Sequence, residues 1–337
     1  MKRKKALLIA GGGTLGGYTS EELLKRGWEV DVILLENRVS LQPALRYFTA
    51  RVDDGLLRKL FAENRYDTVI DFIHYSDPAA YRARAELLLA NTDQLIFLSS
   101  YRVYANEETP VRETSPLLLD VVKDPDFLEN ETYAVPKTKN ERYLFSTGKR
   151  NFTIVRPLIS FSHYRLDLVC TGAPMLLLRQ KEGKPVLLPE EARTKHAGVG
   201  WAGNIGKMFA ALAGNEKALG ETFTLGSDEN LTWEEVAGIY RDVMGLETVW
   251  VETPVYAKTL SDRFYLRYDR LFDRLIDNTK LRGATGLRRG DFLGVREGLQ
   301  REVFYLGEHP EVLPRFESDA AREASAFCDR YLAGKTL

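Results

Sequence analysis

A tyrosine and a lysine stand four positions apart, at Tyr133 and Lys137, near the start of a helix predicted over residues 131–147. At this spacing two side chains share one helix face, with Cβ atoms about 5–6 Å apart. A free tyrosine, with a pKa of about 10, is a poor base at neutral pH. A neighbouring ammonium group favours the phenolate and lowers that pKa. The pair could therefore exchange a proton with a substrate hydroxyl or carbonyl, although an exposed surface pair also explains this spacing.

A serine could add a third group to this pair. Ser100 follows the apolar run 94–98, which is predicted to be a strand. Ligands of open α/β sheets bind beyond the carboxyl ends of the strands. A serine hydroxyl at this place can hydrogen-bond a substrate oxygen beside the tyrosine. Taken alone, the serine is explained more simply as a residue that caps or turns the chain.

The N-terminal region contains a glycine motif. Gly11, Gly13 and Gly16 form the pattern G-x-G-x-x-G between the apolar run 6–10 and a helix predicted over 15–25. Glycine lets the backbone approach a pyrophosphate closely, and the following helix offers free N–H groups to it. The strand–turn–helix context makes the motif specific. It predicts dinucleotide binding by the three glycines together with Thr14 and Leu15, and a hydride exchanged with a nicotinamide would explain the need for a proton-transferring tyrosine.

Two charged residues bear on which dinucleotide binds. Glu36 lies twenty residues after Gly16, at the end of a predicted strand, and could bind the ribose hydroxyls of NAD. Arg38 could instead contact the 2′-phosphate of NADP. Both could also be solvated loop charges. The position of the acid favours NAD and leaves NADP open.

Strand and helix patterns alternate through the first half of the chain. Short apolar runs indicate buried strands over 6–10, 30–35, 68–73, 94–98 and 152–155, and residues 15–25, 56–64, 77–90 and 131–147 indicate helices. This alternation favours a parallel sheet with right-handed crossovers. The predicted fold class is α/β, a Rossmann-type doubly wound parallel sheet with a smaller C-terminal α/β substrate lobe.

The alternation loosens after Arg156-Pro157. We therefore expect residues 1–157 to form the NAD(P)-binding Rossmann domain. Residues 158–337 would form the substrate-binding lobe and C-terminal helices, with later segments free to return to the first domain. The proline-containing stretch after Tyr104 is predicted to be a long surface loop. The run 263–274, which interleaves charged and aromatic residues, is predicted to be an amphipathic helix.

Composition excludes several classes of protein. The 337 residues include 47 basic and 48 acidic ones, and this balance argues against a nucleic-acid surface, which usually shows a basic excess. Cys170 and Cys328 fit neither a disulfide scaffold nor a zinc spacing. No stretch approaches the roughly 20 apolar residues of a membrane span. His74 follows the predicted strand 68–73, near where a substrate could lie, but a single histidine does not make a metal site. His163 and His196 are explained more simply as structural residues, so we expect no metal site. A cytoplasmic protein with no membrane or nucleic-acid partner is expected.

Together these segments resemble the extended or atypical short-chain dehydrogenases/reductases, and more specifically the NAD-dependent epimerase/dehydratase family. The resemblance rests on residues 11–16, 67–73, 97–104, 133–137 and 154–157, which occur in the family's order and at about its spacings. It implies an enzyme that reversibly oxidises a secondary alcohol, or reduces a ketone, of a small sugar-like substrate. Such an enzyme works as an epimerase or as a net oxidoreductase, and its relatives are often homodimers.

The resemblance also assigns roles by position. Ser100 would be the catalytic serine and Tyr133 the general acid/base. Lys137 would bind the nicotinamide ribose and tune Tyr133. Asp53 falls where such enzymes often contact the adenine, at the end of the third strand.

The sequence departs from the family in two places. Enzymes that dehydrate sugar nucleotides usually have an Asp-Glu pair just after the catalytic serine, whereas Tyr101 and Arg102 follow Ser100. This difference argues against a 4,6-dehydratase. Sugar-nucleotide epimerases commonly have an asparagine after the Arg-Pro pair, whereas Leu158 stands there. A nucleoside-diphosphate sugar is therefore in doubt as the substrate.

The alternative function comes from a different class. Some atypical members of the family are described as non-catalytic, nucleotide-bound regulatory or RNA-binding proteins. The complete serine, tyrosine and lysine set and the balanced charge weigh against that role for this chain.

Overall fold

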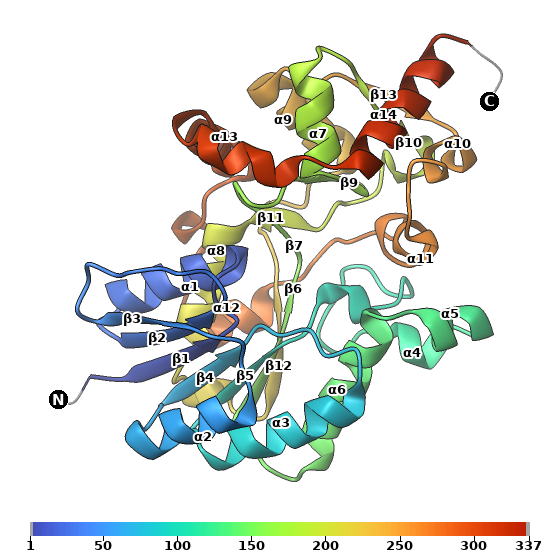
Figure 1. The fold of residues 1–337 in the computed structure, drawn as a ribbon. Coiled ribbons are helices and arrows are strands. Elements are labelled where there is room, and N and C mark those ends of the chain that lie inside the picture. The colour runs from blue at the N-terminus through green and yellow to red at the C-terminus, as the bar shows by residue number, and fades with distance from the viewer. Residues whose placement is uncertain (1–2, 335–337) are drawn as a thin grey trace.

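The centre of the molecule is a sheet of seven parallel strands (Figure 1). The computed structural model describes residues 3–334, apart from the side chain of Arg263. Across the sheet the strands follow the order β12-β6-β5-β4-β1-β2-β3. Their bounds are β1 (Lys5–Ile9), β2 (Glu29–Leu34), β3 (Leu45–Thr49), β4 (Thr68–Asp71), β5 (Leu95–Leu98), β6 (Phe152–Pro157) and β12 (Glu221–Leu225).

Helices cover both faces of this sheet, which is why its strands are apolar without alternation. Leu8 faces the side covered by α1 (Thr14–Lys25), α8 (Ala202–Leu212) and α12 (Thr279–Thr285). Leu7 and Ile9 face the side covered by α2 (Asp54–Glu63), α3 (Pro78–Ala90) and α6 (Ala134–Ser146). The predicted α/β class and doubly wound parallel sheet are confirmed.

The strand order places a topological switch at the middle of the sheet. After β1 the chain proceeds to β2 and β3 on one side, and β4 and β5 then pair on the other side of β1. The loops after β1 and β4 therefore diverge and leave a crevice at their carboxyl ends. Such a crevice is where ligands bind in open α/β sheets.

A second lobe lies above this edge of the sheet in Figure 1. It consists of β8 (Asp167–Leu168), β9 (Thr171–Gly172), α7 (Ala173–Lys181), β10 (Val186–Pro189), α9 (Trp233–Met244), β13 (Thr248–Val251), α10 (Thr253–Ala257), α13 (Val295–Glu308) and α14 (Asp319–Leu332). β7 (Ile159–Phe161) and β11 (Val199–Trp201) pair where the chain passes between the lobe and the sheet. Because β12 is an edge strand of the sheet and α8 and α12 pack beside it, the chain crosses between the two parts several times after residue 157.

Two predicted segments differ from the structure. The stretch after Tyr104 is not only loop, because it contains the short helices α4 (Leu118–Val121) and α5 (Pro125–Asn130). The predicted amphipathic helix over 263–274 is wrong: α11 (Arg263–Tyr265) ends in a five-residue π-type turn, inside which Tyr268 has non-helical angles (φ −104°, ψ 15°). The charged side chains of that segment are mostly buried. The segment therefore has no single solvent-exposed polar face, as an amphipathic helix would have. Among residues 3–334, no helix is long and apolar enough to cross a membrane.

Candidate active site

The glycine turn joins β1 to α1 by a very close backbone approach. A Cβ atom on Gly16 would lie 2.2 Å from the carbonyl oxygen of Gly11, so only glycine fits there. The N–H of Gly11 donates to the carbonyl of Ile33 at 3.1 Å, which ties the turn to β2. α1 begins at Thr14 with neither a side-chain cap nor an acid in its first turn. Its N-terminal N–H groups are therefore available to an anion such as a pyrophosphate.

Gly16→Ala should lower the free energy of unfolding by about 1–3 kcal/mol, because the added methyl group meets backbone rather than a movable side chain. It should also weaken NAD⁺ binding by displacing the turn. Gly17→Ala is the matched control, since nothing lies within 4 Å of a Cβ at Gly17. Urea unfolding and calorimetric titration with NAD⁺ measure both effects. Equal behaviour of the two variants would contradict the role given to the turn.

A pocket of about 460 Å³ adjoins the turn. Gly12 and Glu36 line it, together with Arg51, Tyr75 and Arg84. This pocket is large enough for the adenosine part of a dinucleotide. Glu36 therefore stands where the sequence places it, at the end of β2 beside the glycine turn.

Two other predicted cofactor residues are engaged within the protein. Arg38 donates through Nη2 to the carbonyl of Gly12 at 3.0 Å. Asp53 is the N-cap of α2, where its carboxylate accepts the N–H of Leu56 at 2.8 Å. The carboxylate of Asp53 thus satisfies the helix end, and the pocket is lined by Arg51 just before it. An adenine contact by Asp53 stays a prediction.

The predicted catalytic residues come from two adjacent helix starts. Ser100 is buried and forms the N-cap of η1 (Tyr101–Val103), where its Oγ accepts the N–H of Arg102 at 3.2 Å. Tyr133 is the N-cap residue of α6, and η1 packs against that helix. The buried carboxylate of Glu131 accepts the N–H groups of Tyr133 and Val135 at 3.0 and 2.9 Å. Glu131 thereby fixes the backbone from which Tyr133 projects.

Lys137 lies one helical turn after Tyr133 and is only 1% exposed. Its Nζ donates to the carbonyl of Leu98 at the end of β5 and lies 5.9 Å from the centre of the Tyr133 ring. Burial lowers the pKa of Lys137 to about 8, and the nearby carboxylates of Asp71 and Glu141 only partly offset this effect. The structure therefore brings Ser100, Tyr133 and Lys137 into one region at the carboxyl edge of the sheet.

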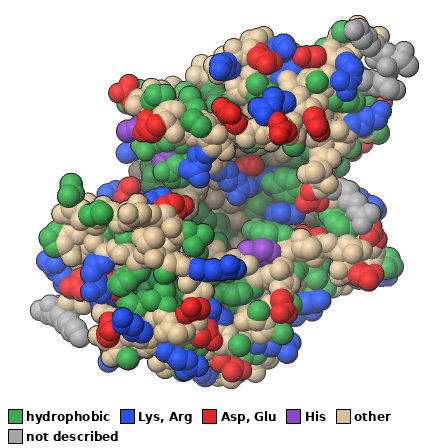
Figure 2. Space-filling view, in the orientation of Figure 1, with side chains coloured by type: hydrophobic (Ala, Val, Ile, Leu, Met, Phe, Trp, Pro, Cys, Tyr) green, Lys and Arg blue, Asp and Glu red, His purple; other side chains and the backbone are tan. Residues whose placement is uncertain are grey.

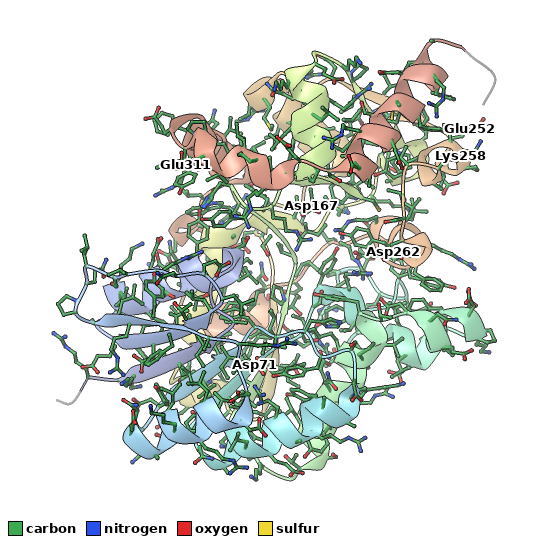
Figure 3. All side chains as sticks on the ribbon, viewed as in Figure 1. Asp71, Asp167, Glu252, Lys258, Asp262 and Glu311 are labelled. Atoms are coloured by element: carbon green, nitrogen blue, oxygen red, sulfur yellow. The ribbon has the colours of Figure 1, made fainter. Side chains whose placement is uncertain are left out.

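Asp71 is a buried carboxyl in the same region that the sequence analysis did not single out. It ends β4, is fully buried, and lies at the centre of the sheet edge labelled in Figure 3. It accepts the N–H of Ile73 at 3.0 Å and the hydroxyl of Tyr75 at 2.9 Å. Burial raises the pKa of Asp71. Its pairing with a tyrosine hydroxyl beside the adenosine pocket orders the loop after β4.

Two further side chains contact the ring of Tyr133. The guanidinium of Arg102 lies 4.7 Å from the ring centre. The ring of His74, which is predicted to lie near the substrate, has its centre 4.9 Å from that of Tyr133, and the two ring planes are inclined at 33°. His74 Nε2 is 2.9 Å from the carbonyl of Thr132, and burial followed by the charges of Lys137 and Arg102 lowers the pKa of its imidazole. The imidazole of His74 therefore lies tilted beside the ring of the candidate acid/base.

The second lobe faces these residues across a hollow with basic and hydrophobic side chains on its surface (Figure 2). Asp167 lies on the upper side of this hollow (Figure 3) and pairs with Arg165 at 2.5 Å. Arg270 is buried, donates to Asp269 at 2.5 Å, and also hydrogen-bonds the hydroxyls of Tyr101 and Tyr265. Arginine side chains thus cross between the two parts of the molecule next to Ser100.

A buried carboxylate holds the loop that follows β7 over the glycine turn. Glu302 of α13 accepts hydrogen bonds from the side chains of Tyr18 and Trp201, and from the backbone and ring of His163 at 2.7 and 2.6 Å. Ser162, one residue earlier, lies 3.1 Å from Thr14 between their Oγ and Oγ1 atoms. The hydroxyl of Thr14 is therefore oriented at the first turn of α1.

The glycine turn and the clustered serine, tyrosine and lysine are in line with a comparison of the chain with known protein families. Residues 7–196 match the model of the NAD dependent epimerase/dehydratase family. The chain belongs to this family. The predicted family is thereby confirmed, and so is NAD as the predicted cofactor, because the family is defined by its dependence on NAD.

Sequence relatives are UDP-glucose 4-epimerases. The chain is 28% identical over 141 residues to the enzyme of Neisseria meningitidis serogroup B, and 28% identical over 134 residues to that of Lactobacillus helveticus. The aligned segments cover 34% of this chain in both cases, and 42% and 41% of those proteins. The chain therefore spans less than half the length of these curated relatives.

Solved structures resemble the chain along almost its whole length. An epimerase from Methanothermobacter thermautotrophicus superposes with a TM-score of 0.70 at 17% identity, covering 93% of this chain and 95% of that one. The UDP-glucose 4-epimerase of Thermotoga maritima with UDP-glucose gives 0.66 at 16% identity, covering 90% and 99%. The enzyme WbmH of Bordetella bronchiseptica with NAD⁺ gives 0.67 at 18% identity, covering 91% and 99%. These likenesses show that the fold is that of the epimerases.

Proposed function

We propose that this protein is an NAD-dependent epimerase that inverts a secondary alcohol of a sugar-like substrate. The observation that supports it most is the clustering of Ser100, Tyr133 and Lys137 at the carboxyl edge of the sheet. There Tyr133 and Lys137 lie on one turn of α6 and Lys137 is tied to the end of β5. Membership in the epimerase/dehydratase family and the UDP-glucose 4-epimerases among its relatives favour epimerisation over other hydride transfers.

The residues of the chain fit a dinucleotide. The space at Gly16, which a Cβ would fill, and the uncapped start of α1 suit a pyrophosphate. Glu36 lines the adjoining pocket and would bind the adenosine ribose. Lys137 would bind the nicotinamide ribose. When bound, NAD⁺ supplies a reversible hydride acceptor at the carbon that is inverted.

The chain's own side chains would move and hold the proton. The phenolate oxygen of Tyr133 would accept the proton of the substrate alcohol, and the resulting hydroxyl would return that proton when the hydride comes back to the substrate. Ser100 hydrogen-bonds the same substrate oxygen. Glu131 holds the Tyr133 backbone in place through two hydrogen bonds, so little reorganisation is needed.

The test measures which sugars are formed and whether NAD⁺ is converted to NADH in the reaction. Purified protein is incubated with NAD⁺ and a panel of UDP-sugars, and the sugars are followed by NMR while NADH is followed by absorbance. We expect two epimers to interconvert with no net NADH. Stoichiometric accumulation of NADH would instead identify a dehydrogenase. The proposal fails if neither nicotinamide cofactor raises the melting temperature, since saturation at about 100 times Kd adds about 2.7 kcal/mol of stability.

A further inference from the structure

Arg102 occupies an unusual position between two aromatic rings. Its guanidinium lies 4.7 Å from the ring centre of Tyr133 on α6 and 4.5 Å from that of Tyr265 on α11. Tyr133 precedes α6 and Tyr265 ends α11, so Arg102 joins two segments that are far apart in the sequence, beside the candidate acid/base. Stacking fixes the plane of a guanidinium while leaving its N–H edges free to donate.

The side chain of Arg102 makes no hydrogen bond within the part of the chain that the structure describes. It is 17% exposed, and its Nε is a buried atom without a hydrogen-bond partner. Its nearest carboxylate oxygens, on Glu131 and Asp269, are 3.6 and 3.5 Å away, beyond good hydrogen-bond distance. A guanidinium has five N–H donors, and burial makes unused donors costly. A ligand that accepts from this group would remove that cost.

The neighbouring arginines each donate several side-chain hydrogen bonds, in contrast to Arg102, although the Nε of Arg274 is also a buried atom without a partner among the described residues. Arg270 donates to Asp269 and to the carbonyl of Val169, among other partners. Arg274 donates to the carbonyl of Tyr104 and, at 3.4 Å, to Asp269. Asp269 is thus shared by three guanidinium groups. Together with Glu131, two carboxylates face three cations, and one positive charge remains to be balanced beside Ser100 and Tyr133.

We propose that Arg102 binds a carboxylate of the substrate, placed on the carbon next to the one that is inverted, so that the substrate belongs to the hexuronic-acid class. Arg102 follows Ser100 by two residues and its guanidinium lies 4.7 Å from the centre of the Tyr133 ring, so an anion that it holds would lie close to both candidate catalytic residues. A carboxylate accepts two parallel hydrogen bonds from one guanidinium edge. This inference rests on the proposed function, because it concerns the sugar that Tyr133 would act upon.

The test uses a pair of sugars that differ only in this group. UDP-glucuronic acid and UDP-glucose are titrated into the NAD⁺-loaded protein by calorimetry, and epimerisation of each is assayed. We expect the acid to bind about 10–100-fold more tightly, as hydrogen bonds to a charged group allow. Equal affinity for the two sugars, or binding of neither, overturns the inference.

Three variants separate recognition from stability. Arg102→Met should remove the preference for the acid. Arg102→Lys keeps the charge but loses the two parallel N–H donors of the guanidinium, so it should retain a preference that is reduced about tenfold. Arg267→Met is the matched control: Arg267 also stacks on a tyrosine, at 5.0 Å from Tyr268, and lies 3.6 Å from a carboxylate, but it is 71% exposed. It should leave the preference unchanged. If Arg102→Met does not fold, the affinities of the wild-type protein for the two sugars still decide whether the substrate carboxylate is recognised.

The outcomes distinguish this inference from the proposed function. A protein that epimerises the neutral sugar as fast as the acid retains the proposed function and loses the carboxylate site. A protein that binds the acid selectively through Arg102, but epimerises neither sugar, retains the site and loses the proposed function.

Discussion

Replacing Tyr133 by phenylalanine is expected to lower the turnover number by about 100–10,000-fold, the usual contribution of a general acid/base. The change should leave the fold intact, because the contacts of Tyr133 in the described structure involve its ring and its backbone. Arg102 and His74 face the ring, and Glu131 accepts the backbone N–H. The hydroxyl itself donates no hydrogen bond to the residues described. Its loss should therefore be seen in catalysis rather than in folding.

Single-turnover and steady-state epimerisation assays would measure the effect, together with calorimetric binding of NAD⁺. Tyr143→Phe is the matched control, since Tyr143 lies on the same helix and its hydroxyl donates to Glu86 at 3.0 Å on the surface. That variant should keep turnover within about twofold of the wild type. A Tyr133→Phe protein that keeps more than a tenth of the wild-type turnover would show that another group moves the proton, and the neighbouring imidazole of His74 would be the first to examine.

The cofactor half of the site could be predicted because its signals are local. β1, the glycine turn and α1 are continuous in sequence, so the turn, its helix and the acid at the end of β2 were all found from spacing. The proximity of Tyr133 and Lys137 could be predicted for the same reason, since Tyr133 is the N-cap of α6 and Lys137 lies on its first turn. Their catalytic roles stay a proposal. One local feature was still missed. The turn begins at Ala10, which has φ 55°, a conformation in which glycine is more common.

The surroundings of Arg102, where we propose that the substrate binds, could not be predicted, because their contacts join segments that are far apart in the sequence. Arg102 meets Tyr265 and Asp269 only after the chain has crossed between the sheet and the second lobe. The run 263–274 has the composition of a solvated helix, yet the buried carboxylate of Asp269 binds arginines from two segments. Asp53, an acid whose position predicts an adenine contact, also caps α2, and that second role depends on the local helix start rather than on a ligand.

Lys137→Met is expected to abolish epimerisation and yet to stabilise the folded protein at pH 7. Lys137 is 1% exposed, and burial lowers its pKa from 10.5 to about 8. That difference corresponds to about 3 kcal/mol by which folding disfavours the charged lysine. Methionine fills a similar volume without a charge. Loss of the hydrogen bond to the Leu98 carbonyl offsets about 1 kcal/mol, so a net gain of about 1–3 kcal/mol is expected.

The pH dependence of that gain follows from the same pKa. Between pH 8 and 10.5 the unfolded chain keeps the proton on Lys137 while the folded protein has lost it, so the wild type becomes more stable as pH rises through this window. Methionine does not titrate, and the advantage of Lys137→Met should therefore shrink from pH 8 upward. Urea unfolding of the NAD-free wild type and Lys137→Met at pH 7 and pH 10 measures this difference in stability. Lys139→Met is the control, because Lys139 is exposed on the same helix. A stability difference that stays constant with pH would show that Lys137 is not buried in its charged form. A stabilised but inactive variant would mean that the buried lysine is retained for its chemistry, at the expense of stability.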